Sequence, residues 1–127
     1  MISRDEVEEL EKLIGQLQGL HTEISVLSKK SPSDAVNAFK LGLINKIVES
    51  ANIVLGPKYL PFAQFSGFDS DDLPSTSDVT FVIAQYLEEV ERYRSDNIIY
   101  SRGHWMYVIN GDVSDIRTGS PSKVKEK

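Results

Sequence analysis

The residues best suited to binding are arginines and aromatics gathered in the last third of the chain. Guanidinium groups bind phosphate or carboxylate with two parallel hydrogen bonds, and aromatic rings stack on bases. The same residue types also dominate protein interfaces. We therefore expect this region to contact a protein partner, with a small anionic, nucleotide-like ligand as the alternative. The candidate residues are Arg94, Arg102, His104, Trp105, Tyr107 and Arg117.

A purely structural interpretation of this set also stays open. Aromatic side chains belong in a core as readily as in a binding site, and arginine stems can lie buried at its rim while their charged ends reach water. In that case the aromatics of the set form the core and the arginines surround it.

Residues for catalysis and metal binding are scarce. The chain has no cysteine and only two histidines, so thiolate and histidine-rich metal sites are excluded. The acidic run 69–72 lacks the glycine and the distant glutamate of a calcium-binding loop, and we interpret it as a solvated turn. A hydrolase using His104 stays as a third hypothesis because triads have no fixed spacing, but no nucleophile elbow is present. We expect no enzymatic activity, no metal and no cofactor.

Composition narrows the class of protein further. Of the 127 residues, 40% are hydrophobic and 26% are charged, which is typical of a globular domain rather than a disordered chain. The net charge of −5 argues against a nucleic-acid partner, because phosphate backbones repel an acidic chain. No stretch approaches the ~20 apolar residues that span a membrane, and the charged start is unlike a signal peptide. We expect a cytoplasmic protein.

Helices must position the candidate residues. A capping box formed by Ser3 and Glu6 begins the first helix, expected at 4–29, and its apolar residues recur in steps of three and four. Ser31 and Pro32 resemble the cap and first residue of a second helix at 32–55, which Gly56-Pro57 should end. The short link makes these two helices an antiparallel hairpin.

The remaining chain alternates between irregular and regular segments. Residues 57–76 carry aromatics between prolines, and we expect an irregular segment pinned onto the bundle. A third helix, capped by Ser75 or Ser77, follows at about 76–97.

The C-terminal part contains strand formers. Asn110-Gly111 is a preferred type I′ turn, so we expect a hairpin at about 104–118 that places Trp105, Tyr107 and Ile109 on one face. Residues 119–127 are expected to be a disordered tail. The predicted fold is therefore mainly α, a helical hairpin plus a third long helix and a small C-terminal β-hairpin, in a single domain covering 1–118.

The helices carry more apolar surface than a small bundle hides. Long stripes can be satisfied inside one bundle or can build a dimer, and we expect a homo-oligomer, most simply a twofold dimer. The predicted function is that of a non-enzymatic interaction, adaptor or inhibitor protein. The alternative is a protein that binds or sequesters a small anionic ligand.

One similarity gives that alternative a definite form. The segment 32–52, with its helical periodicity and its Ala51-Asn52 pair, resembles the second helix of the hairpin domain in phage proteins that sequester cyclic-nucleotide or related immune signals. The resemblance implies a protein that binds or sequesters a small, nucleotide-like anionic ligand. It does not extend to the aromatic segment or to the C-terminal hairpin.

Overall fold

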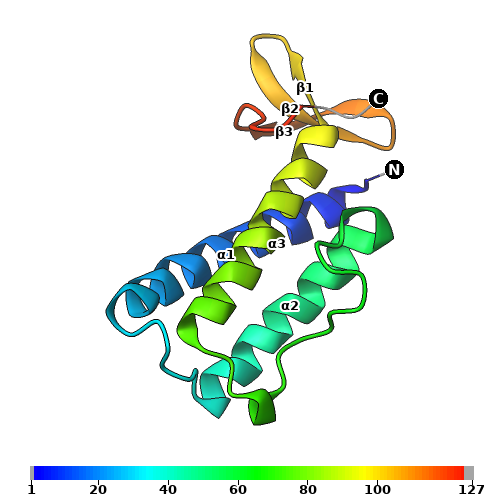
Figure 1. Ribbon diagram of the computed structural model, residues 1–127. Helices are drawn as coiled ribbons and strands as arrows, with labels where there is room; N and C mark the ends of the chain where they lie inside the picture. Colours follow the sequence, from blue (N-terminus) through cyan, green and yellow to red (C-terminus); the bar gives the residue numbers. More distant parts are fainter. Residues whose placement is uncertain (1, 125–127) are drawn as a thin grey trace.

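Three long helices and a small sheet make up the computed structural model, which describes residues 2–124 (Figure 1). The fold is mainly α with a small β part at the C-terminal end, as predicted. The helices are α1 (Arg4–Lys30), α2 (Ala38–Tyr59) and α3 (Thr76–Asp96), with a short 3-10 turn η1 (Ser70–Asp72), and the strands are β1 (Ile98–Ser101), β2 (His104–Ile109) and β3 (Asp112–Thr118).

The helix α1 runs antiparallel to both other helices (Figure 1). At its start, the predicted capping box is present: Ser3 Oγ accepts from the Glu6 amide and Glu6 Oε1 accepts from the Ser3 amide, each at 3.2 Å. At its end, the hydroxyl of Thr76 in the first turn of α3 donates to the Ser31 carbonyl at 2.7 Å. This contact brings the last turn of α1 to the first turn of α3.

The predicted start of the second helix at Pro32 is wrong. The helix begins at Ala38, where the Asn37 side chain accepts from the Lys40 amide at 2.8 Å. The backbone before it bonds to the entry of α3 instead: the Thr76 amide donates to the Asp34 carbonyl at 2.9 Å. A backbone group held in this long-range pair cannot also join a helical ladder.

Gly56 interrupts α2 without ending it. Its φ of 67° is non-helical and kinks the helix, and one further turn follows to Tyr59. The predicted stop at Gly56-Pro57 therefore marks a kink, and the end of the helix is four residues later than predicted.

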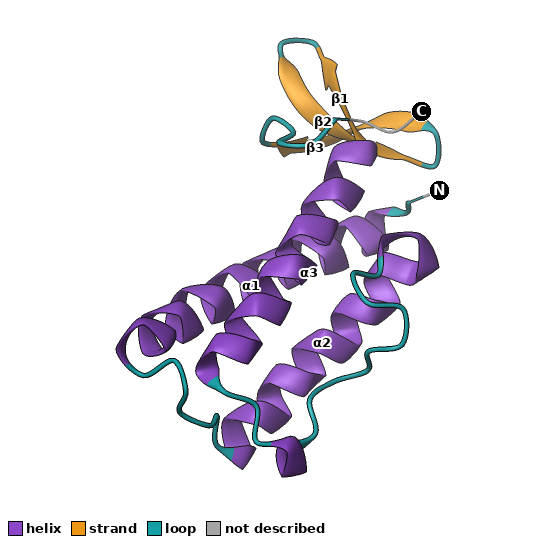
Figure 2. Cartoon of the chain, in the orientation of Figure 1, coloured by secondary structure: helices purple, strands orange, loops and turns teal. Residues whose placement is uncertain are grey.

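The aromatic segment runs as a loop beside α2 (Figure 2), and two asparagines of that helix pin it onto the bundle. Asn45 donates to the Phe68 carbonyl at 2.8 Å and accepts from the Phe68 amide at 2.7 Å. Asn52 donates to the Phe65 carbonyl at 3.0 Å and accepts from the Tyr86 hydroxyl at 2.6 Å. The irregular, pinned segment expected from the sequence is confirmed.

The predicted hairpin is present and gains a third strand. The strands pair antiparallel in the order β1-β2-β3. Asn110 and Gly111 have φ values of 52° and 87°, as a type I′ turn requires, and Arg102 and Gly103 form a similar turn at 54° and 85°. The strand β1, directly after α3, was not predicted.

The tail is also different from the prediction. Residues 119–124 follow β3 back along α3 and hydrogen-bond to it, so their predicted disorder is wrong. Residues 125–127 of the predicted tail lie outside the described part of the chain. Among the described helices, none is both long and apolar enough to cross a membrane.

Candidate functional site

The six candidate residues do not form one surface. Arg94 and Tyr107 are buried and Trp105 is half-buried, whereas Arg102, His104 and Arg117 are exposed. Arg94 belongs to α3, Arg102 to the β1–β2 turn, and the others to the sheet. Arg94 and Tyr107 are thus placed to make contacts inside the fold, and the exposed side chains are the ones that a partner can reach.

Tyr107 lies in the core between the sheet and α1. Its side chain is 0% exposed, and its hydroxyl donates to Glu11 Oε1 at 2.7 Å. Burial and the hydrogen bond to the Glu11 carboxylate both raise the pKa of this phenol well above its usual range. Tyr107 therefore joins the sheet to the helices, and its predicted place in an interface is wrong for this side chain.

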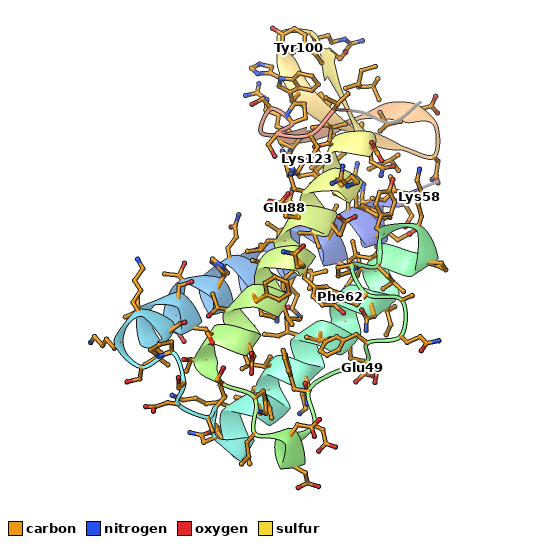
Figure 3. The ribbon with its side chains drawn as sticks, viewed as in Figure 1. Glu49, Lys58, Phe62, Glu88, Tyr100 and Lys123 are labelled. Carbon is orange, nitrogen blue, oxygen red and sulfur yellow. The ribbon has the colours of Figure 1, made fainter. Side chains whose placement is uncertain are left out.

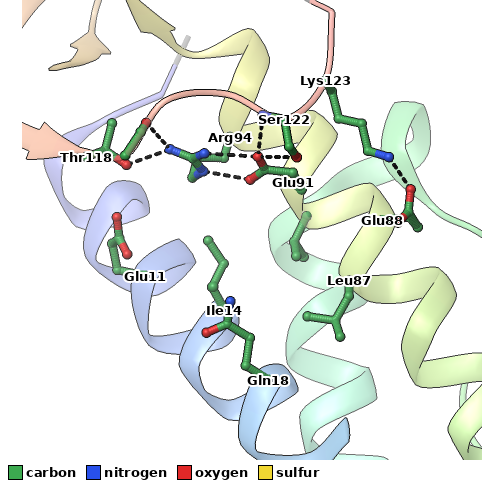
Figure 4. Close-up of a pocket in the computed structure, with 12 residues that line it drawn as sticks. Glu11, Ile14, Gln18, Leu87, Glu88, Glu91, Arg94, Thr118, Ser122 and Lys123 are labelled. Atoms are coloured by element: carbon green, nitrogen blue, oxygen red, sulfur yellow. Dashed lines mark hydrogen bonds and ion pairs between the residues drawn. The ribbon is translucent and has the colours of Figure 1, made fainter. Parts of the chain in front are cut away.

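Arg94 fastens the C-terminal segment to α3 (Figure 4). Its Nε and Nη2 donate to the two Glu91 oxygens at 2.7 and 2.9 Å. Nη1 donates to Thr118 Oγ1 at 2.7 Å and to the Gly119 carbonyl at 2.8 Å, and Nη2 also donates to the Ser120 carbonyl at 2.7 Å. All these acceptors belong to the same chain, so the guanidinium is engaged in holding the fold.

Glu91 continues the same network toward the chain end. Its Oε2 accepts from the Ser122 amide at 2.9 Å and from the Ser122 hydroxyl at 2.7 Å. One turn earlier, Glu88 pairs with Lys123 (Figure 3). Burial alone raises the pKa of the Glu91 carboxyl, but hydrogen bonds from Arg94 and Ser122, with the guanidinium charge, outweigh it and lower the pKa to about 2.

Acid should therefore destabilise the protein through Glu91. The pKa of this carboxyl is about 2 in the folded protein against a usual value of 4.5. The unfolded state thus binds the proton first, and the stabilisation is complete above pH 4.5 and is lost as the pH falls toward 2. We expect the difference in urea midpoint between the wild type and Glu91→Gln to shrink over that range. A difference that stays constant with pH would contradict the assignment.

A cavity of about 630 Å³ lies beneath this C-terminal segment, between α1 and α3 (Figure 4). Three carboxylates line it, from Glu11, Glu88 and Glu91, together with Arg94 and Lys123. The positive groups are already paired with Glu91 and Glu88. Among the described residues that line it, this charge balance is unsuited to an anionic ligand, because the three carboxylates repel an anion and both cations are already paired.

The exposed members of the candidate set lie on the small sheet. Arg102 occupies the β1–β2 turn and His104 begins β2. Arg117 is on β3, where it lies opposite Met106 of β2. Trp105 packs against the Tyr100 ring at 5.5 Å in a T-shaped arrangement. The accessible part of the predicted set is thus divided between two faces of the sheet: His104 and Arg117 lie on one face, and Trp105, together with Tyr100, lies on the other.

An apolar groove between α1 and α2 was not among the candidate sites. Its walls are Leu20 and Leu27 on α1 and Phe39, Leu43 and Ile47 on α2, enclosing about 290 Å³; we call it the α1–α2 groove. Exposed Glu23 and Lys40 also line it, and the Phe39 side chain is 77% exposed. The signal in the sequence is the four-residue spacing of Phe39, Leu43 and Ile47, which marks one helix face.

Metal binding and similarity to known proteins give no further support to a particular site. Within residues 2–124, no three histidine or acidic side chains gather where they could hold a metal ion. The Asn52 of the segment that resembles phage sequestering proteins is engaged inside the molecule, with Phe65 and Tyr86. Comparison with protein-family models, with curated proteins and with solved structures finds no match to this chain.

Proposed function

We propose that this is a non-enzymatic, cytoplasmic interaction protein that acts as a homodimer, with the α1–α2 groove as the contact between the two copies. The supporting observation is the set of exposed apolar side chains on both walls of the groove, from Leu27, Phe39 and Leu43. Contiguous apolar surface of this kind is characteristic of protein interfaces. The lack of cysteine suits the reducing cytoplasm.

The charges in the groove favour a second copy as the occupant. In a twofold dimer the same patch faces itself, so a residue that contacts another makes the reciprocal contact across the axis. Glu23 lies on the α1 wall and Lys40 on the α2 wall. The groove thus carries one charge of each sign, so two copies that face each other can pair the glutamate of each with the lysine of the other while the apolar residues meet between the pairs.

The test compares two exposed phenylalanines. We expect wild-type protein at tens of micromolar to have twice the 14.2 kDa chain mass by size-exclusion chromatography with light scattering. Phe39→Asp places a carboxylate in the contact and should weaken dimerisation by about 100-fold. Phe39 lies in the first turn of α2, where a negative charge suits the helix dipole, so the fold should be unharmed.

Phe81→Asp is the matched control. Phe81 lies on α3, outside the α1–α2 groove, and its side chain is 61% exposed. This variant should remain a dimer. A monomeric wild type, or equal loss of dimer in both variants, would overturn the groove as the contact.

A further inference from the structure

The strand β1 is an edge of the sheet with unpaired backbone groups. Its outer side has no neighbouring strand in the part of the chain that the structure describes. The Val108 amide donates to the Asn97 carbonyl at 2.8 Å, and Ile98 lies opposite Tyr107. In antiparallel pairing this pattern makes Ile98–Tyr107 a non-hydrogen-bonded pair and Ile99–Met106 a hydrogen-bonded one. The amide and carbonyl of Tyr100 therefore point away from β2.

The two edges of the sheet are protected to different degrees. The β3 edge carries Asp112 and Asp115, the latter paired with Arg4 at 2.7 Å, and its pairing with β2 is irregular between Met106 and Val108. Charges and irregularities of this kind keep other strands from adding to an edge. β1, with the sequence Ile-Ile-Tyr-Ser, has no charged residue and no proline. It is the edge open to another strand.

Basic residues stand at the end of this open edge. Arg102 follows β1 in the turn and His104 begins β2, and both are exposed. Arg102 makes no ion pair within residues 2–124, and neither does Arg117 on the same sheet. Arg117 lies on β3, two strands from this edge, so in a chain of net charge −5 it is the unpaired guanidinium of Arg102 that marks a place for a carboxylate beside β1.

We propose that β1 binds an extended acidic segment of a partner protein, which adds to the sheet as a fourth strand. Main-chain hydrogen bonds to Tyr100 would give affinity, and a carboxylate near Arg102 would give specificity. This proposal shares with the proposed function only the claim that the protein acts by binding other proteins. The β1 edge is separate from the α1–α2 groove.

Side chains on both faces of β1 suit such a strand. Tyr100 is 60% exposed and projects at the end of the molecule far from the helices (Figure 3), where its ring meets Trp105. Ile99 is exposed on the opposite face. An added strand alternates its side chains between these two faces, so apolar residues in it can cover the ring pair or Ile99.

The probe is an end-capped peptide of alternating glutamate and valine, about six residues long. Its binding is followed by the fluorescence of Trp105, the only tryptophan in the chain. We expect saturable binding, and weaker binding by at least about fivefold for a lysine–valine peptide of the same length. Arg102→Gln should remove most of that preference. No binding of the glutamate–valine peptide, or equal binding of both, overturns the proposal.

A pair of substitutions isolates the backbone contact. Tyr100→Pro removes the outward amide but no bond to β2, whereas Tyr100→Val loses the same ring and keeps the amide. We expect the proline variant to bind the peptide about tenfold more weakly than the valine variant, and equal binding would contradict the added strand. If the proline variant does not fold, hydrogen exchange of the wild type decides: the peptide must slow exchange of the Tyr100 amide at least tenfold.

The outcome also separates the two proposals. Phe39→Asp should lose the dimer and bind the peptide unchanged. If instead Tyr100→Pro makes the dimer dissociate, β1 pairs with β1 of a second copy, and the proposal of an acidic partner is overturned. Peptide binding by a monomeric wild type would overturn the groove contact alone.

Discussion

Replacing Arg94 with methionine is expected to lower the free energy of unfolding by about 3 kcal/mol. The change keeps much of the aliphatic stem but removes the five hydrogen bonds that the guanidinium donates to Glu91, Thr118, Gly119 and Ser120. Glu91 then stays partly buried without its cation, and an unpaired carboxylate in such a place costs more than the pair contributes. Urea unfolding followed by circular dichroism should show a lower midpoint at an unchanged slope.

The neighbouring arginine provides the control. Arg92 also pairs with a glutamate three residues earlier, but its Nε lies 3.4 Å from Glu89, and it makes no hydrogen bond or ion pair with residues 118–124. Arg92→Met should cost less than about 1 kcal/mol, as partly exposed pairs usually do. If both variants lost the same stability, the role of Arg94 in fastening residues 118–120 to α3 would be refuted.

The helices could be predicted because their signals are local. The capping box at Ser3 and Glu6 needs only residues three apart, and it is present in the structure. The false start at Pro32 had an equally good local signal. What overrides it is a pairing between the backbone around Asp34 and that around Thr76, some forty positions away, which no local pattern encodes.

The candidate site was only partly predictable. Alternation along β2 already placed Tyr107 between Trp105 and Ile109 on one face, so its burial follows from the pattern once that face packs on the helices. Arg94 occurs four residues after Val90, on the buried stripe of α3, and this position was the clue that its charge is used internally. The partners that satisfy it, at 118–120, are set by tertiary packing alone.

The strand β1 escaped prediction for a different reason. Ile98 to Ser101 is a short run that directly follows a helix, and the two-residue turn after it has arginine, not the usual asparagine, in its first position. Arg102 adopts a φ of 54°, which costs a residue with a Cβ some strain, and Gly103 then makes the turn tight. Only strand pairing reveals that Arg102 belongs to a turn beside an open edge.

Tyr107→Ala is expected to lower the free energy of unfolding by about 4 kcal/mol, enough to unfold much of a small domain. The ring is fully buried between the sheet and α1, so its removal leaves a cavity. It also removes the hydroxyl that donates a hydrogen bond to Glu11. Thermal unfolding followed by circular dichroism measures the loss. The same variant would keep wild-type stability if Tyr107 were an exposed interface residue.

Tyr100→Ala is the comparison that gives this result meaning for function. Tyr100 is on the same sheet but is 60% exposed, so its truncation should cost less than about 1 kcal/mol. A large loss for Tyr107 beside a small one for Tyr100 means that a partner can use the Tyr100 end of the sheet without disturbing the fold. Equal losses would mean that the β1 edge is itself part of the core, and a partner strand would then have no free surface to join.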